Sequence, residues 1–173
     1  GRTGVRVLVR LTSGNQFGMD EEDILASIRN RGCYPHLDLA GLQYYSGTQK
    51  KGMEKIEKEL VKLDSFMDFV REHLDFEFRE LEYGPGLPVP YFDGDDFTDT
   101  LAPARALAPA LQEAAGWAHL TVEMGRFYTA ECGFYLTTAM DCKDHDGQHY
   151  CIVDGGMNHL NYLGQIMGMK RPH

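Results

Sequence analysis

Strand-like and helix-like segments alternate along the first 130 residues, and a polar or glycine-rich loop follows each strand-like segment. The apolar and β-branched runs predict strands over 5–11, 37–44, 81–83 and 120–123. Strands separated by helices form a parallel sheet, and in a barrel the functional loops lie at the carboxyl ends of the strands. A closed (β/α)8 barrel needs about eight strands, and about four are counted here. We therefore expect an α/β fold in which 1–130 form half of a barrel.

Three helices are predicted between these strands. The first follows the capping residue Asp20 and ends near Gly32. The second carries apolar residues from Met53 to Val70 at steps of three and four, with charged residues on its other face. The third is predicted over about 96–115. These helices would cover the sheet.

The pattern changes after residue 130. Two strands, over 134–143 and 148–154, are separated by Asp146-Gly147, which is a strong signal for a tight β-hairpin. A hairpin of this kind belongs to an antiparallel sheet. The region 131–173 is therefore predicted to be the beginning of a second, antiparallel β-domain.

Composition excludes several classes of protein. With 43% hydrophobic residues the chain can form a packed core, and a net charge of −9 argues against a nucleic-acid partner. No apolar stretch approaches the roughly 20 residues of a membrane span, and no signal peptide is visible. Four sparse cysteines indicate thiols in the cytoplasm. The chain opens without Met and enters a strand expected to be buried at Val5, as an internal piece of a longer protein would.

Three strand ends carry loops that could hold a phosphate: 46–48 (Ser-Gly-Thr), 84–86 (Gly-Pro-Gly) and 125–126 (Gly-Arg). Their glycines leave backbone N–H groups unobstructed, Thr48 adds a hydroxyl, and Arg126 adds a forked positive charge. A single glycine after a strand is usually only a turn. Glu123, two residues before the last loop, fits either a salt bridge or a carboxylate that keeps a pyridine nitrogen protonated.

Five short elements, in their order and spacing along the chain, resemble the ornithine/diaminopimelate decarboxylase family. These are pyridoxal 5′-phosphate (PLP) enzymes with the alanine-racemase-like fold. Residues 41–49 (Gly-Leu-Gln-Tyr-Tyr-Ser-Gly-Thr-Gln) are similar to the family's Gly-Leu-His-x-His-x-Gly-Ser-Gln, and 84–86 to its Gly-Gly-Gly. Residues 123–126 (Glu-Met-Gly-Arg) resemble Glu-Pro-Gly-Arg, and 153–158 (Val-Asp-Gly-Gly-Met-Asn) resemble Val-Asp-Ala-Gly-Met-Asn. Residues 15–18 (Asn-Gln-Phe-Gly) resemble Ser-Lys-Phe-Gly.

The resemblance implies PLP as cofactor and an amino acid as substrate. Glu123 would pair with the pyridine nitrogen, and Tyr45, in place of a histidine, would stack on the ring without that histidine's ability to move a proton. Gln43 replaces a second histidine, and Pro85 replaces a glycine and removes one N–H. The phosphate would be held by the three strand-end loops, through Gly47, Thr48, Gly84, Gly86, Gly125 and Arg126.

The resemblance also shows what this sequence lacks. The family's Schiff-base lysine lies in a Tyr-Ala-x-Lys context that no lysine here shares, and its catalytic Cys–Asp pair, which acts across a dimer interface, is not found. We therefore assign no catalytic residue and expect the chain alone to be inactive. The parent protein is expected to be a homodimeric PLP-dependent amino-acid decarboxylase.

Alternatives remain open at this stage. The same barrel type occurs in amino-acid racemases and in PLP-binding regulatory proteins without enzyme activity, although the latter generally lack the β-domain. A sugar-phosphate isomerase would share only the phosphate site. In the hairpin, Cys142 falls opposite Cys151, so zinc is conceivable, but His145 and His149 are offset and alternation could place them on different faces. Two packed thiols without a metal are the simpler interpretation.

Overall fold

The computed structural model describes residues 4–92, 94–156 and 158–159. The chain divides into two compact units: the first runs up to Val89 and resumes over Asp99–Phe127, and the second comprises Pro90–Thr98 and the chain from Tyr128 onward. In the part of the chain that the structure describes, no helix combines the length and the apolar character needed to cross a membrane.

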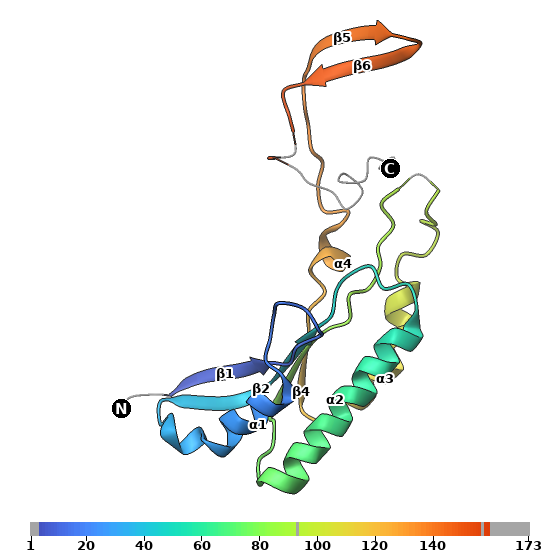
Figure 1. Ribbon diagram of the computed structural model, residues 1–173. Coiled ribbons are helices and arrows are strands. Elements are labelled where there is room, and N and C mark those ends of the chain that lie inside the picture. The colour runs from blue at the N-terminus through green and yellow to red at the C-terminus, as the bar shows by residue number, and fades with distance from the viewer. Residues whose placement is uncertain (1–3, 93, 157, 160–173) are drawn as a thin grey trace. The chain divides into compact units, whose positions relative to one another are not determined.

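The first unit is built on a four-stranded sheet in the order β1-β2-β3-β4, and every neighbouring pair is parallel (Figure 1). Its strands are β1 (Val5–Arg10), β2 (Leu37–Tyr45), β3 (Glu80–Gly84) and β4 (His119–Val122). The predicted parallel sheet is thus confirmed. Sequential order without crossing means that the carboxyl ends of β2, β3 and β4 lie side by side.

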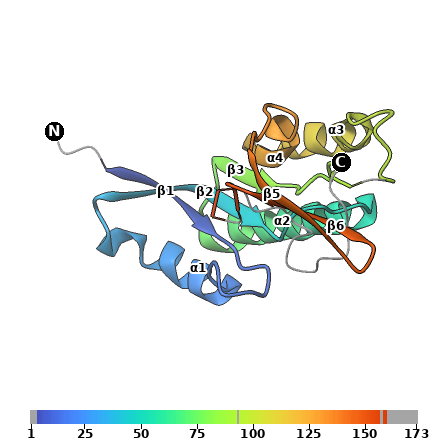
Figure 2. The same cartoon turned by 90° about the horizontal axis from the view of Figure 1, so that it is seen from above.

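Helices α1 (Glu21–Arg29), α2 (Met53–Leu74) and α3 (Ala102–Ala114) pack against this sheet (Figure 2). A short 3-10 turn η1 (Arg31–Cys33) follows α1, and α4 (Gly125–Thr129) follows β4. The predicted start of the third helix near residue 96 is wrong. Asp96 instead accepts a hydrogen bond from the Thr98 N–H at 2.8 Å in a turn, and a proline lies in the first turn of α3.

The two faces of the sheet differ in character. Side chains alternate along each strand, so Leu42, Tyr44, Leu81 and Tyr83 share the buried face that packs under the helices. Gln43 and Glu82 lie opposite each other on the other face, which is polar. In β1, the expectation of a fully buried strand is wrong: Val9 is buried but Val5 is 62% exposed, because β1 forms the edge of the sheet.

The second unit contains the predicted hairpin. Strands β5 (Ala139–His145) and β6 (Gln148–Val153) pair antiparallel, and Asp146 and Gly147 have φ values of 49° and 75° in the turn between them. Such a pair of left-handed residues matches the right-handed twist of the two strands. The first strand begins at 139 and not at 134 as predicted. All residues of both strands are exposed.

Candidate functional site

The ends of β2, β3 and β4 converge on one pocket of about 290 Å³. Tyr45, the last residue of β2, pairs with Gly84, the last residue of β3. Glu123 follows β4 directly, and its N–H donates a 2.9 Å hydrogen bond to the Tyr83 carbonyl, which continues the sheet by one residue. The lining of the pocket comes entirely from the first unit: Tyr45, Thr48, Leu87, Glu123, Met124, Gly125, Arg126 and Phe127.

The structure therefore brings together most of the residues that the sequence singled out. Tyr45, Thr48, Glu123, Gly125 and Arg126 all line this pocket. The remaining candidates, Gly47, Gly84 and Gly86, are not among the residues that line it. Gly84 and Gly86 let neighbouring segments approach closely, whereas Gly47 has a φ of 126° and no other segment within 4 Å of where a Cβ would lie.

Glycines are required at two of these positions by contacts across the loops. Gly86 has a φ of 64°, and a Cβ there would overlap the Gly47 carbonyl oxygen. A Cβ on Gly84 would lie 2.6 Å from Cδ2 of Tyr45. Side chains rarely tolerate either condition. The glycines of the β3 loop therefore allow the β2 loop and the Tyr45 ring to pack directly on the backbone.

Arg126 and Thr48 approach each other across the pocket. The Arg126 guanidinium donates a hydrogen bond from Nη1 to Thr48 Oγ1 at 3.3 Å, although the two residues are 78 positions apart. A guanidinium beside a hydroxyl and a glycine-rich backbone is an arrangement that binds oxyanions. This end of the pocket can therefore hold a phosphate.

Glu123 forms the other chemically distinct end of the pocket. Its Oε1 accepts a 2.7 Å hydrogen bond from Gln43 Nε2. A hydrogen bond with Glu123, together with desolvation and the charge of Glu123, raises the pKa of Glu82. Gln43 Oε1 is buried without a hydrogen-bond partner among the described residues. Glu123 is thus a carboxylate oriented by two neighbours on the polar face of the sheet.

Arg10 is a site residue that the sequence reasoning missed. Its guanidinium lies 5.8 Å from the centre of the Tyr45 ring and 5.2 Å from that of Phe17, and Nη2 donates to the Tyr45 carbonyl at 3.4 Å. A cation at this distance from an aromatic face is attracted to it. Arg10 ends β1, so the rule that placed loops at strand ends could have found it. The Tyr45 ring therefore does have a cationic neighbour.

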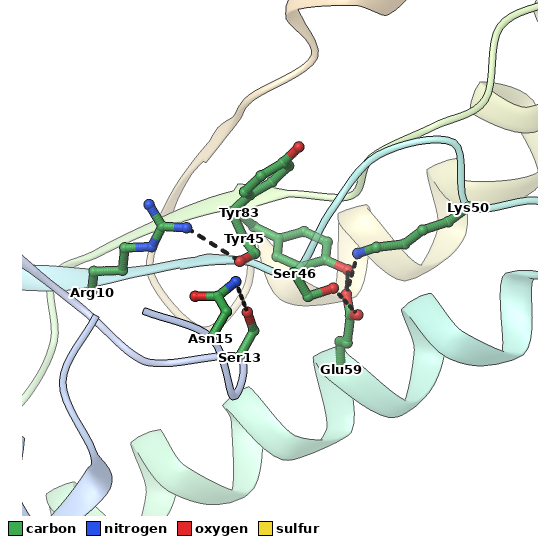
Figure 3. Close-up of polar contacts among 8 residues, drawn as sticks. All are labelled: Arg10, Ser13, Asn15, Tyr45, Ser46, Lys50, Glu59 and Tyr83. Carbon is green, nitrogen blue, oxygen red and sulfur yellow. Dashed lines mark hydrogen bonds and ion pairs between the residues drawn. The ribbon is translucent and has the colours of Figure 1, made fainter. Parts of the chain in front are cut away.

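A second group that was missed lies behind the β2 loop, where Glu59 of α2 accepts hydrogen bonds from Ser46, Lys50 and Tyr83 (Figure 3). The sequence reasoning assigned charged residues of this helix to its exposed face. For Glu59 that assignment is wrong, because the residue is only 7% exposed. Spacing could have shown this, since Glu59 lies three residues after Ile56 and four before Leu63, both buried.

The hairpin holds the other candidate site. Cys142 pairs directly with Cys151 as predicted, and their Sγ atoms are 3.2 Å apart. Adjacent cross-strand pairs place His145 and His149 on opposite faces of the ribbon. His149 hydrogen-bonds Asp144 at 2.8 Å. Within the described residues, no group of three or more His, Cys, Asp or Glu is placed to hold a metal ion.

Comparison with known proteins gives these features a family context. The family described as "Pyridoxal-dependent decarboxylase, pyridoxal binding domain" matches residues 8–130. The L-glutamyl-(BtrI acyl-carrier protein) decarboxylase of Niallia circulans is 27% identical over 164 residues, which are 91% of this chain and 38% of that protein. Diaminopimelate decarboxylase of Escherichia coli is 28% identical over 131 residues, 72% of this chain and 30% of that protein.

Solved structures show the same relationship at the level of the fold. A crystal structure of lysine/ornithine decarboxylase from Vibrio vulnificus, complexed with cadaverine, aligns with a TM-score of 0.74 at 24% identity, covering 95% of this chain and 44% of that one. Diaminopimelate decarboxylase from M. jannaschii, in complex with L-lysine, aligns with a TM-score of 0.72 at 20% identity, covering 90% and 40%. The family match covers well over half of this chain, which therefore belongs to the pyridoxal-dependent decarboxylases, within their pyridoxal-binding domain.

Proposed function

We propose that this chain is the part of a PLP-dependent amino-acid decarboxylase that anchors the cofactor through its phosphate and through its ring nitrogen. The observation that carries the proposal is a single pocket with an oxyanion-binding end, at Arg126 and Thr48, and a carboxylate, Glu123. PLP presents a phosphate and a pyridine nitrogen at separate points of one small molecule. The residues present therefore fit the cofactor.

The phosphate would be bound by the loops at the strand ends. Arg126 would supply a permanent charge and a fork of N–H donors, and Thr48 a hydroxyl. Gly47, Gly84, Gly86 and Gly125 would keep the surrounding backbone unobstructed. Pro85 contributes no N–H, so the anchoring depends more on Arg126 than it would in a loop of three glycines.

Glu123 would pair with the pyridine nitrogen and keep it protonated. A protonated ring accepts the electron pair that is left when CO2 departs from a bound amino acid, and this is the chemistry that PLP supplies. Gln43 holds one carboxylate oxygen of Glu123. Tyr45 would lie against the ring as an aromatic surface, and the contact of Arg10 with the Tyr45 ring and carbonyl would help to fix its position.

No lysine is among the residues that line the described pocket. Lys50, on the neighbouring loop, is instead buried against Glu59. We infer that the chain alone holds PLP without a covalent bond and does not turn over substrate. The decarboxylase activity, its amino-acid substrate and the predicted homodimer and cytoplasmic location are properties proposed for the whole protein.

The fold supports a matching assignment of regions. We infer that 1–130 form the C-terminal half of a PLP-binding (β/α)8 barrel and that 131–173 begin the antiparallel β-domain. The polar face of the sheet, with Gln43 and Glu82, would then face the interior of the barrel, since helices cover only the other face. Parallel sheets are normally covered on both faces, and further strands of a barrel would supply that cover.

The test compares PLP with pyridoxal, which lacks the phosphate, in equilibrium titrations of the full chain. PLP is expected to bind at least about tenfold more tightly, because charge-assisted hydrogen bonds to the phosphate are lost with pyridoxal. The Glu123→Gln variant should weaken both compounds alike, since it changes only the ring end. Equal affinities for PLP and pyridoxal in the unmodified chain would contradict the proposed phosphate site.

A further inference from the structure

The strongest feature outside the pocket is the buried carboxylate of Glu59. Its Oε2 accepts hydrogen bonds from Lys50 Nζ at 2.7 Å and from the Tyr83 hydroxyl at 2.8 Å, and its Oε1 accepts one from Ser46 Oγ at 2.5 Å. Figure 3 shows the three donors, from the β2 loop and from β3, converging on this one side chain of α2. Lys50 and Glu59 are both 7% exposed.

Burial has measurable consequences for these groups. Desolvation lowers the pKa of Lys50, although the hydrogen bond and charge of Glu59 oppose this effect. Desolvation, followed by the hydrogen bond to Glu59, raises the pKa of Tyr83. A buried ion pair is seldom better for stability than apolar side chains of similar size. The stability of the unit therefore does not explain why four polar groups meet here.

The position of the donors suggests another explanation. Ser46 immediately precedes Gly47, and Tyr83 immediately precedes Gly84, so both are attached to the loops of the proposed phosphate site. Lys50 closes the β2 loop, and its N–H donates to the Gly86 carbonyl at 2.9 Å. The Glu59 carboxylate thus connects the β2 loop to the β3 loop through its hydrogen bonds with Ser46, Lys50 and Tyr83.

A second set of hydrogen bonds, between the Gln49 side chain and the Val89 backbone, restrains the same loop. The Gln49 side chain accepts a hydrogen bond from the Val89 N–H at 2.8 Å and donates one to the Val89 carbonyl at 2.9 Å. Gln49 itself has a φ of 56°, a conformation that non-glycine residues adopt only when their surroundings enforce it. The backbone between Ser46 and Lys50 is therefore restrained at both ends.

We propose that Glu59 is a positioning residue for phosphate binding: with Lys50, Ser46 and Tyr83 it holds the β2 and β3 loops in the geometry that receives the phosphate of PLP. This inference rests on the proposed function. Glu59 does not line the pocket, so it acts through the loops and not by contact with the ligand.

The test removes both charges at once, in the full chain, with the double variant Glu59→Leu/Lys50→Met. The replacements are apolar and of similar volume, so the cost to folding is that of the Ser46 and Tyr83 hydroxyls that lose their acceptor, and urea unfolding checks that the variant is folded. Its affinity for PLP should fall about tenfold toward that for pyridoxal, while its affinity for pyridoxal stays unchanged. Equal effects on PLP and pyridoxal, or no effect on PLP, would overturn the inference.

A matched control removes the same two charges from an exposed pair. Lys62 Nζ and Glu21 Oε1 lie 3.3 Å apart with side chains about half exposed, and neither residue belongs to the β2 or β3 loop. The variant Glu21→Gln/Lys62→Met should bind PLP like the unmodified chain. A loss of PLP affinity in this control equal to that of the buried double variant would show a general charge effect and would contradict the positioning role.

Two further readouts keep the inference testable if the double variant folds poorly or PLP does not bind. Tyr83→Phe removes one hydroxyl and should weaken PLP but not pyridoxal, by less than the double variant. Without any ligand, amide hydrogen exchange over 46–50 should be faster in Tyr83→Phe than in the unmodified chain. Unchanged exchange there would refute the positioning role, whereas faster exchange without phosphate-dependent binding would refute only the proposed function.

Discussion

The parallel sheet and the β5–β6 hairpin were both expected from sequence, yet they are held together by different means. In the sheet, Leu63, Leu81 and Tyr83 belong to a core that α1, α2 and α3 cover. In the hairpin every strand residue is exposed, and turn chemistry at Asp146 and Gly147 sets its shape. An isolated two-stranded hairpin is only marginally stable. The comparison shows that a correct strand prediction carries no information about what stabilises the strands.

The largest expected effect is a difference between the two regions in how much stability a truncated apolar side chain costs. Leu63→Ala should lower the free energy of unfolding by about 2–5 kcal/mol, because it leaves a cavity under the sheet. Ile152→Ala removes as many carbon atoms from the exposed hairpin and should cost under about 0.5 kcal/mol. Urea unfolding of the two variants measures both values. Similar losses in the two variants would mean that the hairpin is packed as firmly as the sheet.

The second prediction concerns which region binds the cofactor. Arg126→Ala should weaken PLP binding about ten- to a hundredfold, because it removes the charged donor from the phosphate end of the pocket. His149→Ala, in the hairpin, should leave the affinity unchanged. Fluorescence titration of both variants provides the comparison. A larger loss with His149→Ala would move the binding site to the hairpin.

The third prediction uses the polar face of the sheet. The pKa of Glu82 is raised in the folded chain, so its stabilising contribution is complete below the ordinary Glu value of 4.5 and is lost as the pH rises through the raised value. The free energy of unfolding of Glu82→Gln should therefore fall less than that of the unmodified chain as the pH rises over this range. Asp144→Asn in the hairpin is the control and should retain the loss. Identical pH profiles for Glu82→Gln and the unmodified chain would be inconsistent with a raised pKa at Glu82.

The smallest expected effect is on the hairpin itself. With the Cys142 and Cys151 Sγ atoms 3.2 Å apart, exchange with oxidised glutathione should join them: the two thiols lose two hydrogens while glutathione disulfide is reduced to two thiols. Intact mass should fall by two hydrogens, and Cys142→Ser should prevent this. The urea midpoint of the sheet unit should not change. A stabilised sheet would show that the two units unfold together.

Sequence was most informative where a period or a turn signal determines local structure. The apolar repeat beginning at Met53 located α2, and Asp146-Gly147 located the hairpin turn. The start of α3 was misplaced because the Asp96 side chain forms a local turn that competes with the helix. The period of the apolar residues therefore predicts that a helix is present, but its first residue also depends on side-chain hydrogen bonds that compete with the helix.

The site was predictable only as a set of loops. Glycine-rich segments after parallel strands had to lie at one edge, and the structure places Thr48 and Arg126 there within hydrogen-bond distance. The contact of Gln43 with Glu123 depends on strand register, which the sequence did not specify. The burial of Glu59 could be inferred from helical spacing, but its three donors come from segments that only the folded sheet brings together.

The most direct test of the central claim is a PLP titration of the full chain, followed by borohydride reduction and intact mass measurement. We predict saturable binding of one equivalent and no stoichiometric adduct on any single lysine, because the pocket anchors PLP by phosphate and ring contacts alone. Absence of saturable binding would contradict the claim that the chain anchors PLP. Quantitative labelling of one lysine would contradict the claim that it does so without a covalent bond.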